Sequence, residues 1–483
     1  MHMSTDDPGQ DHDVVVLGGG TGGYSTALRA ADLGLSVALV EQDLVGGTCL
    51  HRGCIPSKAL LQAASVMEAV DDDARRWGIK ATVEQVDPAA LAAARDEVVD
   101  KNYKGLLGHL RHSRVTIFKG HGRLTSPRSV LVSPRPGSEL GAPVELRARR
   151  GVVVATGSTP RELPGIPSDG QRVLTSDDAT RSDRIPRSAI VVGAGAVGVE
   201  FASFYRAFGA EVTLVEVLER VLPAEDPDVS RELHRALRRK GVKVLVGARV
   251  QEATVSDQGV SVTVTDANGA HALAADLLLS AVGRSPASDG TGLDELGIER
   301  DRGFVVPADW GRLETRVPGV HVVGDLLPPP SLALAHASFA EGLLVAEVLA
   351  GLPGVPVRYE GVVRATYSLP EAASVGLSEP QARELGYDVV VNRFPLTGVA
   401  KGLIYGQGGM VKVVAQKNGP VLGIHLVGPH VTELAAEAML ITNWEALPSE
   451  VAELVHPHPS LSEAIGEAHL TLAGRRLHQQ QAS

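Results

Sequence analysis

Short runs of apolar residues recur along the chain, and two of them lead directly into the same glycine pattern. The first run covers residues 14–17 and precedes a G-x-G-x-x-G sequence formed by Gly18, Gly20 and Gly23. A helical pattern follows, and a second apolar run ends at Glu41, 18 residues after Gly23. An unbroken apolar run is typical of a buried parallel strand. Because such glycines let the backbone approach a pyrophosphate and the acid binds a ribose, this segment predicts a dinucleotide-binding unit.

The same pattern recurs in SAIVVGAGAVGVEFASFYRAFGAEVTLVEVLER. Gly193, Gly195 and Gly198 follow its first apolar run, and Glu216 again lies 18 residues after the third glycine. Two similar domains are therefore expected to bind two dinucleotides. An acid at the end of the second strand favours NAD, because it would repel the 2′-phosphate of NADP. Arg220 lies nearby and leaves this preference open.

Three further glycines lie where such folds return the chain to a cofactor. The sequences ATGSTP, AVGRSP and VVGD place Gly157, Gly283 and Gly324 after short apolar runs. Asp325 follows the last of these glycines at the expected end of a strand. A carboxylate in that position can bond a polyol, which is what the ribityl chain of FAD offers. The sequence thus indicates FAD as one of the two dinucleotides.

The pattern changes from about residue 356 onward. The stretch GGMVKVVAQKNGPVLGIHLVGPH alternates around an Asn-Gly turn, which predicts an antiparallel hairpin, and VTELAAEAMLITNW has amphipathic helical spacing. The predicted fold class is α/β, with two Rossmann-like dinucleotide-binding domains and a C-terminal α+β domain. The predicted boundaries are 1–157 and 285–355 for the first domain, 158–284 for the second and 356–483 for the third.

Composition and charge narrow the range of partners. The 483 residues correspond to roughly three domains of about 150 residues each. Lysine and arginine number 46 against 57 acidic residues, a net charge of −11 without a basic run, which argues against nucleic acid and anionic membranes. No apolar run approaches the ~18–20 residues of a membrane span. The N-terminal MHMSTDDPGQDHD is unlike a signal peptide, so we expect a cytoplasmic location, and we expect the C-terminal RRLHQQQAS to fray.

The chain has only two cysteines, Cys49 and Cys54, in a C-x4-C spacing. A disulfide needs Cα atoms about 4.4–6.8 Å apart, whereas five residues span roughly 8.6 Å in a helix. A bond between these cysteines would therefore need a sharp bend, which Gly53 permits. Pro56 suits the first turn of a following helix, where Lys58 would also lie, and a thiol in such a position has a lowered pKa. A redox dithiol is one interpretation; two buried apolar residues or half of a zinc site are the others.

A second candidate for chemistry lies near the C-terminus, in HPHPSLSEAIGEAH. His458 stands between two prolines and five residues before Glu463, and Ser460 or Ser462 can cap the helix that follows. A carboxylate at that distance could orient the imidazole and raise its basicity. The alternative is a surface histidine beside a helix cap. A metal site with His456 is disfavoured, because no carboxylate or cysteine cluster accompanies the two histidines, and we predict no metal.

Taken in order, these motifs resemble the pyridine nucleotide–disulfide oxidoreductases, and among them most closely the lipoamide-oxidising members. The most specific segment is GGTCLHRGCIPSKALL, and TRVPGVHVVGD, LAHASFAEG, PEAASVGLSE and HPHPSLSEA follow in the family's order. The similarity extends from about residue 12 to residue 478. It implies FAD in the first domain, NAD in the second, and a homodimer joined through the C-terminal domain.

The resemblance also implies roles around the cysteines. Cys49 and Cys54 would form the redox-active disulfide beside the flavin, with Cys49 exchanging with the substrate and Cys54 facing the flavin. Lys58 would lie near the flavin N5 and pair with Glu200.

His458, oriented by Glu463, would deprotonate the incoming dithiol across the subunit boundary of the homodimer. The implied reaction is oxidation of protein-bound dihydrolipoamide with reduction of NAD. Only about a dozen residues precede the first domain, so we expect the lipoyl group to come from an E2-type or H-type partner protein.

Cofactor contacts can be carried over residue by residue. Those expected at FAD are Gly18, Gly20, Gly23, Glu41, Thr48, Lys58, Gly122, Asp325 and Ala335. Those expected at NAD are Gly195, Gly198, Glu216, Val250 and Gly283. Gly122 and Val250 rest only on their positions within weak motifs. The chain departs from the family pattern in three consecutive prolines at 328–330, in AVGRSPASDG without the usual Asn, and in Ser460 where Thr is usual.

Two alternatives remain. The first is a reductase that uses NAD(P)H to reduce a different disulfide or a quinone on the same scaffold; mercuric reduction is disfavoured because the C-terminus has no cysteine pair. The second is a non-catalytic subunit that binds FAD and NAD, against which the presence of both cysteines and of the His458 and Glu463 pair argues.

Overall fold

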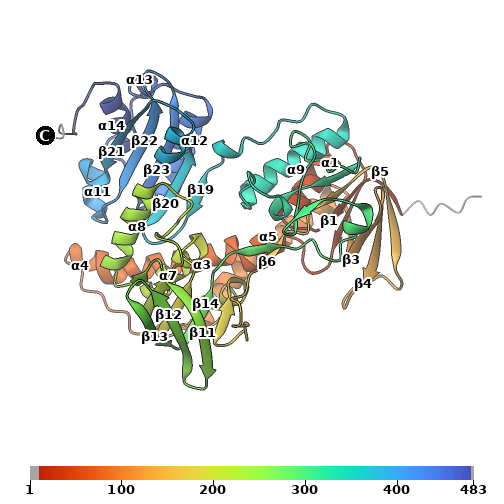
Figure 1. Cartoon of the computed structure of the whole chain (residues 1–483), viewed down its shortest axis with the longest axis horizontal. Helices are drawn as coiled ribbons and strands as arrows, with labels where there is room; N and C mark the ends of the chain where they lie inside the picture. The colour runs from red at the N-terminus through yellow and green to blue at the C-terminus, as the bar shows by residue number, and fades with distance from the viewer. Residues whose placement is uncertain (1–9, 480–483) are drawn as a thin grey trace, which may run out of the picture. The chain divides into compact units, whose positions relative to one another are not determined.

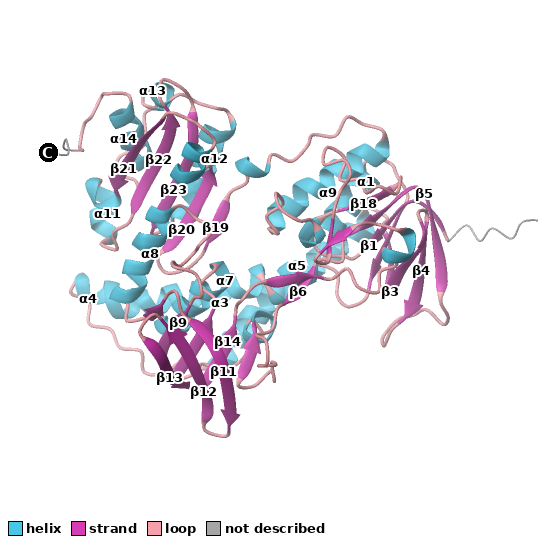
Figure 2. Cartoon of the chain, in the orientation of Figure 1, coloured by secondary structure: helices cyan, strands magenta, loops and turns pink. Residues whose placement is uncertain are grey.

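The computed structural model describes residues 10–479 (Figures 1 and 2). The chain divides into two compact units, each described by itself below. The first comprises Met1–Ala59, Ala92–Pro160 and Arg284–Tyr359, and the second comprises Leu60–Leu91, Arg161–Gly283 and Glu360–Ser483. Within the described range, no helix combines the length and apolarity needed to cross a bilayer. Residues 1–9 lie outside this range. They form most of the N-terminal segment that we expect not to be a signal peptide.

The first unit is built on a six-stranded sheet in the order β1-β2-β3-β4-β5-β18, with β1 also paired to β5. Its strands are β1 (Asp11–Leu17), β2 (Val37–Glu41), β3 (Thr116–Ser126), β4 (Ser129–Pro134), β5 (Val144–Val154) and β18 (Val320–Val322). The pairings of β1, β2, β3, β5 and β18 at the centre are parallel, whereas β3, β4 and β5 extend as an antiparallel meander. The apolar run of β1 is buried on both faces, as predicted.

Helices α1 (Thr21–Asp32) and α9 (Ala335–Ala350) lie side by side in this unit (Figure 1). Small residues make their close approach possible, since a Cβ on Gly342 would come within 2.1 Å of Ser25 Oγ. The other elements are α2 (Gly47–Arg52), the first part of α3 (Cys54–Glu68), most of α5 (Pro88–His112), η2 (Asp294–Leu296), η3 (Gly324–Leu326), η4 (Tyr359–Gly361) at the unit's edge, and the strand pairs β6 (Ser158–Pro160) with β15 (Arg284–Pro286) and β16 (Arg300–Asp301) with β17 (Phe304–Val305).

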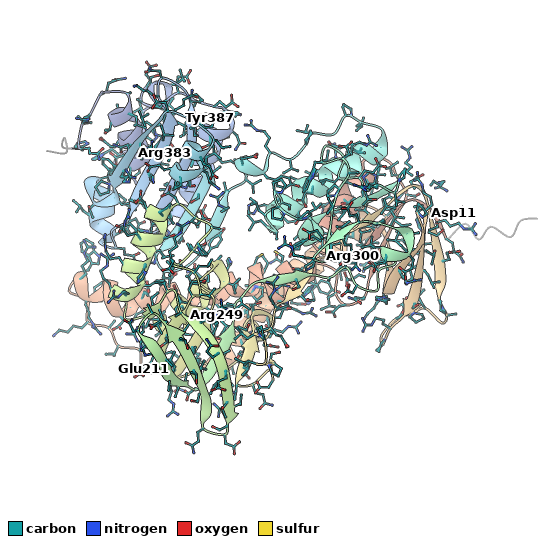
Figure 3. All side chains as sticks on the ribbon, in the orientation of Figure 1. Asp11, Glu211, Arg249, Arg300, Arg383 and Tyr387 are labelled. Atoms are coloured by element: carbon teal, nitrogen blue, oxygen red, sulfur yellow. The ribbon has the colours of Figure 1, made fainter. Side chains whose placement is uncertain are left out.

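The second unit begins with a five-stranded parallel sheet in the order β10-β9-β8-β14-β7. Its strands are β7 (Val173–Thr175), β8 (Ser188–Val192), β9 (Glu211–Val215), β10 (Lys243–Leu245) and β14 (Leu277–Ser280). Beside it stand α6 (Ser176–Ala179), α7 (Ala196–Ala207), α8 (Pro227–Arg239) and an antiparallel sheet of β11 (Arg249–Ser256), β12 (Gly259–Asp266) and β13 (Gly269–Ala275). The remainder of α3 supplies Leu60, Leu61 and Ala64 to its core, followed by η1 (Ala69–Asp73) and α4 (Ala74–Arg76). Glu211 and Arg249 point outward from its surface (Figure 3).

The C-terminal part of the second unit is an antiparallel sheet in the order β19-β20-β23-β22-β21. Its elements are β19 (Arg364–Thr366), β20 (Glu371–Gly376), α10 (Glu379–Glu384), β21 (Val389–Pro395), η5 (Leu396–Gly398), α11 (Ala400–Tyr405), β22 (Met410–Gln416), β23 (Val421–Gly428), α12 (Val431–Asn443), α13 (Pro448–Val451) and α14 (Glu463–Leu472). The predicted hairpin is β22–β23, and Asn418 takes the left-handed conformation in its turn (φ 57°). The predicted helix is α12.

A buried ion cluster joins this sheet to the start of α8. The ammonium of Lys412, on β22, lies 2.8 Å from Asp226 Oδ1, 2.7 Å from Asp228 Oδ2 and 2.9 Å from Glu379 Oε2. Lys412 and Asp226 are fully enclosed, with side-chain exposures of 2% and 0%. The second dinucleotide-binding part and the C-terminal part therefore share one compact unit, and the finer division of the chain at 158, 285 and 356 stays a prediction.

The expectation that the C-terminal tail frays is wrong for residues 475–479. His478 Nδ1 lies 2.7 Å from Glu467 Oε1, and Gln479 Nε2 donates to the Arg393 carbonyl at 2.9 Å. Polar side chains hold this segment to the body of the protein, which a hydrophobic pattern could not indicate. Residues 480–483 lie outside the described range.

Candidate active site

The first glycine pattern forms the turn between β1 and α1. Gly18 has φ +106°, and a Cβ there would lie 2.3 Å from the Ala155 carbonyl oxygen. A Cβ on Gly23 would lie 1.8 Å from the Gly18 carbonyl oxygen, whereas Gly20, the N-cap of α1, has nothing within 4 Å. Gly18 and Gly23 are thus required because a side chain would collide with a carbonyl oxygen, and Gly20 leaves open space at the N-terminus of α1. Backbone amides there favour an anion, so the turn fits a pyrophosphate.

Glu41 closes the same turn at the end of β2. Its carboxylate accepts hydrogen bonds from the backbone amides of Gly19 and Asp43, both at 2.7 Å. Burial raises the pKa of Glu41, and the hydrogen bond from Gly19 acts in the opposite direction. The carboxylate is therefore fixed where a ribose is expected. We call this turn, with Glu41, the first cradle.

The second glycine pattern repeats this geometry between β8 and α7. Gly193 has φ +100°, and its Cβ would lie 2.4 Å from the Ala281 carbonyl oxygen. A Cβ on Gly198 would meet the Gly193 carbonyl oxygen at 1.7 Å, and Gly195 again has nothing within 4 Å. Glu216 accepts from the amides of Ala194 at 2.6 Å and Leu218 at 2.8 Å. This second cradle fits a second dinucleotide by the same criteria.

Asp325 belongs to a polar network in the first unit that the sequence only partly indicated. Its carboxylate accepts a hydrogen bond from Ser158 Oγ, and Arg284 Nε donates to the same Oγ at 2.7 Å. Arg284 also reaches Thr48 Oγ1 at 3.4 Å. Burial raises the pKa of Asp325, while Ser158 and Arg284 oppose the shift. Ser158 was not predicted, because its role depends on a contact 167 residues away.

Glu341 is a second residue that sequence reasoning missed. It lies on α9, which begins at the predicted Ala335, and is completely buried. Its carboxylate accepts from the Gly324 amide at 2.7 Å, Ser331 Oγ at 2.9 Å and the Tyr359 hydroxyl at 3.0 Å, and burial raises its pKa. Glu341 thereby anchors the turn that carries Asp325. The available signal was an acid among the apolar residues of a helix.

The two cysteines lie at a break between helices. Cys49 is on α2, Gly53 is the C-cap of that helix, and α3 begins at Cys54. This break supplies the predicted bend. Both side chains are partly buried, and in this structure the two cysteines are in the thiol form.

The expectation of a lowered thiol pKa is wrong for Cys49. Its side-chain hydrogen bond with Cys54 raises the pKa most, and burial adds to the rise. The charge of Lys58 and a hydrogen bond from the Cys54 backbone oppose them. A pair of adjacent sulfurs gives up its first proton more easily than its second, because the second ionisation is opposed by the first. The sequence showed the helix end and the lysine, but not this coupling.

Tyr24, directly after Gly23, was also missed. Burial and the charges of Cys49 and Cys54 together raise the pKa of Tyr24 to about 12. Its ring centroid lies 5.7 Å from that of Phe339, on α9. The first cradle and the cysteine pair are therefore electrostatically coupled within one unit.

The histidine and carboxylate near the C-terminus are paired as predicted. His458 Nδ1 lies 2.7 Å from Glu463 Oε1, and Glu463 also accepts from the Ser460 amide at 2.8 Å. Burial disfavours the Glu463 carboxylate, but the bonds from Ser460 and His458 outweigh it and lower its pKa. With Nδ1 engaged, the imidazole presents Nε2, and 72% of the side chain is exposed. This arrangement suits a surface-accessible base.

His456 forms a separate pair with Glu437, whose Oε1 lies 2.7 Å from Nε2. The bond to Glu437 raises the pKa of His456. The two histidines therefore have different carboxylate partners.

The remaining predicted residues are placed as follows. Glu200 is buried on α7 and accepts from the Tyr367 amide at 2.9 Å, and its pairing with Lys58 on α3 stays a prediction. Gly122 lies within β3, where a Cβ would come within 2.4 Å of Leu17. Val250 is in β11, and Gly283 follows β14 with φ +107°. The cofactor contacts of these residues also stay predictions.

Two dinucleotide cradles, a pair of cysteine thiols beside the first and an accessible carboxylate-oriented histidine define a class: a flavoprotein disulfide oxidoreductase that uses two dinucleotides. Comparison with known families agrees. The family "Pyridine nucleotide-disulphide oxidoreductase" matches residues 12–342, and its dimerisation domain matches residues 362–469. The chain belongs to this family, whose cofactors are FAD and NAD.

Individual relatives extend this similarity over nearly the whole chain. A dihydrolipoyl dehydrogenase of Bacillus subtilis is 38% identical, covering 97% of this chain and 99% of the relative. One from Zymomonas mobilis is 37% identical with the same coverage. Among solved structures, LpdA from Mycobacterium tuberculosis superposes with a TM-score of 0.85 at 27% identity, covering 95% of this chain and 99% of that one. The predicted α/β fold class, the FAD and NAD cofactors and the disulfide oxidoreductase class are confirmed.

Proposed function

We propose that this enzyme oxidises dihydrolipoamide, carried on a lipoylated protein, to lipoamide and reduces NAD to NADH. The observation that carries the proposal is the Cys49 and Cys54 pair at the break between α2 and α3, beside a cradle that fits FAD. The full-length similarity to proteins named dihydrolipoyl dehydrogenase supports the choice of substrate.

The cysteine pair performs the exchange with the substrate. In the oxidised enzyme the two sulfurs share a disulfide, and a substrate thiolate attacks Cys49, breaks that bond and releases the Cys54 thiolate. The second substrate thiol then attacks the mixed disulfide, which forms the S–S bond of lipoamide and frees Cys49. Two electrons and two protons thus leave the substrate. The bound FAD and NAD supply the acceptor chemistry for this electron pair.

His458, oriented by Glu463, accepts the proton of the substrate thiol. Glu463 holds Nδ1, so Nε2 is free to accept the proton of the attacking substrate thiol, and the carboxylate stabilises the imidazolium that results. His458 belongs to the second compact unit and the cysteines to the first. We propose that His458 serves the cysteines of the other subunit in a homodimer, which the match to a dimerisation domain supports.

The partner and the location complete the proposal. An E2-type or H-type protein would present the lipoyl group, which the full-length similarity to proteins named dihydrolipoyl dehydrogenase supports. A cytoplasmic location suits a catalytic dithiol, because reducing conditions keep structural disulfides rare there.

The test is NAD reduction by free dihydrolipoamide and by a lipoylated carrier domain, in wild type, Cys49→Ser and His458→Ala. We expect fast wild-type turnover that is lost in Cys49→Ser and falls at least about 100-fold in His458→Ala. Quinone reduction by NADH should survive in both variants, because it needs neither side chain. Weak wild-type turnover with dihydrolipoamide, alongside intact quinone reduction, would instead favour another disulfide or a quinone as substrate.

A further inference from the structure

Helix α8 of the second unit concentrates positive charge in a chain whose net charge is −11. It lines a cavity of about 650 Å³, together with the loop that follows β9. Six basic side chains face this cavity: Arg220, Arg231, His234, Arg235, Arg238 and Arg239. The one acidic residue in the lining is Glu219. Neither the family motifs nor the proposed reaction uses this site.

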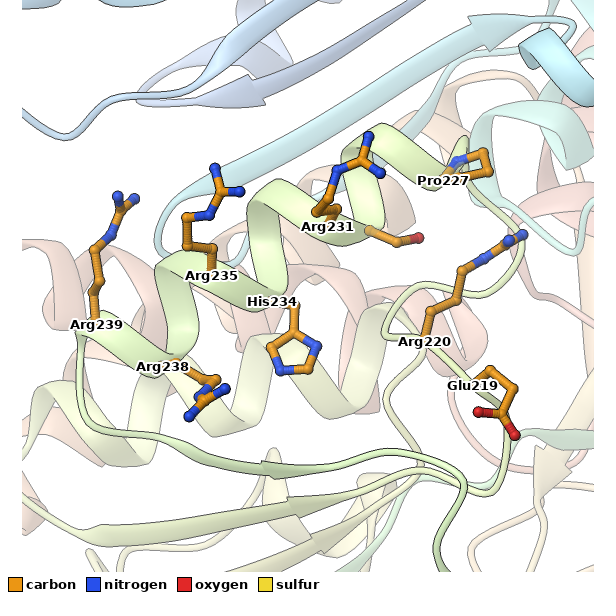
Figure 4. Close-up of a pocket in the computed structure, with 9 residues that line it drawn as sticks. Glu219, Arg220, Pro227, Arg231, His234, Arg235, Arg238 and Arg239 are labelled. Carbon is orange, nitrogen blue, oxygen red and sulfur yellow. The ribbon is translucent and has the colours of Figure 1, made fainter. Parts of the chain in front are cut away.

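The basic residues are spaced to form two rows along the helix. Arg231, Arg235 and Arg239 repeat every four residues, and His234 and Arg238 form a second row with the same interval (Figure 4). Each step of four residues rises about 6 Å, so the longer row extends over roughly 12 Å. The guanidinium groups are therefore arranged in a line and not around a point. Such an array suits an elongated anion.

Neighbouring carboxylates neutralise only part of this charge. Arg231 pairs with Asp228, and Arg235 pairs with Glu232 at 2.6 Å, yet their side chains remain 60% and 57% exposed. Among the described residues, no ion pair engages Arg238 or Arg239. These arginines can accept an anion without first losing a partner inside the protein.

The loop side of the cavity adds two further features. Arg220 donates to the Pro223 carbonyl at 2.8 Å, while its buried Nε has no hydrogen-bond partner among the described residues. Burial and then the charge of Arg238 lower the pKa of His234. Together with Pro227, the imidazole ring of His234 offers flat surface beside the arginines.

We propose that this cavity binds a small polyanion with a chain of phosphate groups, of the kind carried by a nucleoside triphosphate. Arginine binds phosphate oxygens through two parallel hydrogen bonds, and a chain of phosphates would lie along the rows of arginines. The volume lies within the range of small-molecule sites and exceeds what a single phosphate needs. The flat surface of His234 and Pro227 would receive the nucleoside.

The residues that line the cavity are close in sequence to those of the second cradle, but they are different residues. Glu216, whose carboxylate is held by the Ala194 and Leu218 amides, precedes Glu219 by three residues. The 2′-phosphate of NADP is therefore a second source of phosphate that could reach the arginines. The experiment has to separate this source from a free polyphosphate.

The experiment is isothermal titration of the FAD-containing enzyme, saturated with NAD, with inorganic tripolyphosphate and then with ATP. Saturation with NAD blocks the second cradle, and tripolyphosphate carries no adenosine. We expect binding by wild type, about tenfold weaker binding by Arg238→Gln, and a further loss in Arg235→Gln/Arg238→Gln. Arg111→Gln is the matched control, because Arg111 lies in the last turn of α5 as Arg238 does in α8. It should bind as wild type does.

Retained flavin absorbance and unchanged NAD reduction would show that the variants are folded. The proposal is overturned if tripolyphosphate does not bind under NAD saturation, or if all four proteins bind it equally. NADP is titrated into the same enzyme without NAD as a further comparison. The proposal is also overturned if NADP alone binds and NAD displaces it, because the arginines would then extend the dinucleotide site.

Discussion

The two cradles have nearly the same geometry, yet the chain surrounds them with different structures. Each residue of the second pattern lies 175 positions after its counterpart in the first. A Cβ added at equivalent glycines would lie at nearly the same distance from the nearest carbonyl oxygen. The distances are 2.3 and 2.4 Å for Gly18 and Gly193, and 1.8 and 1.7 Å for Gly23 and Gly198. The glycines and the terminal acid therefore specify how the backbone receives a dinucleotide.

The differences begin at the positions between the glycines. Gly22 lets α1 approach Val323, whereas its counterpart Val197 is 40% exposed. Ser25 packs against α9, whereas its counterpart is the buried Glu200. The strand after the first cradle leads to the cysteines, and the strand after the second leads to the arginines of α8. The reaction is thus determined by residues outside the repeated pattern.

The largest expected effect comes from adding a methyl group at the first glycine of each cradle, which tests whether the first cradle binds FAD and the second binds NAD. In Gly18→Ala or Gly193→Ala the Cβ would contact a carbonyl oxygen, and a left-handed φ costs a non-glycine residue about 1–3 kcal/mol more. We expect Gly18→Ala to purify without flavin. Gly193→Ala should keep its flavin and lose about 100-fold in NAD reduction, because the pyrophosphate is displaced. Flavin absorbance and steady-state rates test this, and equal flavin loss in both variants would contradict it.

Glu341 supports the turn that carries Asp325, in the same compact unit as the first cradle. Replacement by Ala would strand the Gly324 amide, Ser331 and Tyr359 in the interior. We expect Glu341→Ala to lower the free energy of unfolding by about 3 kcal/mol, measured by urea with flavin release as the probe. The KM for NAD should not change. A raised KM for NAD with unchanged flavin retention would contradict this expectation, because Glu341 would then support the second cradle and not the first.

Glu216 tests the nucleotide preference of the second cradle. We expect Glu216→Ala to raise the KM for NAD about tenfold with little change in kcat, because charge-assisted hydrogen bonds to a ribose are lost. Glu219→Ala is the control three residues further along and should change the KM less than about twofold. Steady-state kinetics with NAD and NADP measure both. Equal effects of the two substitutions would argue that charge near the loop, and not the ribose contact, sets the KM.

The smallest expected effect is the pH dependence that burial gives to Glu41. Because its folded-state pKa is raised, Glu41 contributes stability that is fully present below its unfolded pKa, near 4.5, and is lost as the pH rises through the folded pKa. Glu41→Gln should remove this dependence. The measurement is the difference in unfolding free energy between the apo forms of wild type and variant from pH 4 to pH 7. A difference that does not vary with pH would show that burial of Glu41 has no such effect.

The elements predicted correctly from sequence are those encoded locally. Both cradles, the β22–β23 hairpin and the pairing of His458 with Glu463 depend on residues close in the chain, so spacing alone indicates them. Ser158 and Glu341 escaped prediction, because their partners lie on segments distant in sequence or on turns without a motif.

The pKa of Cys49 shows a different limit. Its position near a helix end and Lys58 could be read from the sequence, but the dominant cause, the bond to Cys54, depends on the bend between two helices. Lys412 shows a third limit, since a lysine within a strand gives no sign that carboxylates from α8 and α10 will enclose it.

The buried cluster around Lys412 also bears on how the chain can be divided by a protease or in evolution. A fragment ending at residue 355 would contain the buried Asp226 without Lys412, its cation, while Asp228 would keep only Arg231. Removing one partner of a buried ion pair costs about 3–5 kcal/mol, a large share of the 5–15 kcal/mol that holds a typical domain together. We therefore expect the NAD-binding module to survive excision only together with the C-terminal sheet, and the two to have been inherited as one piece.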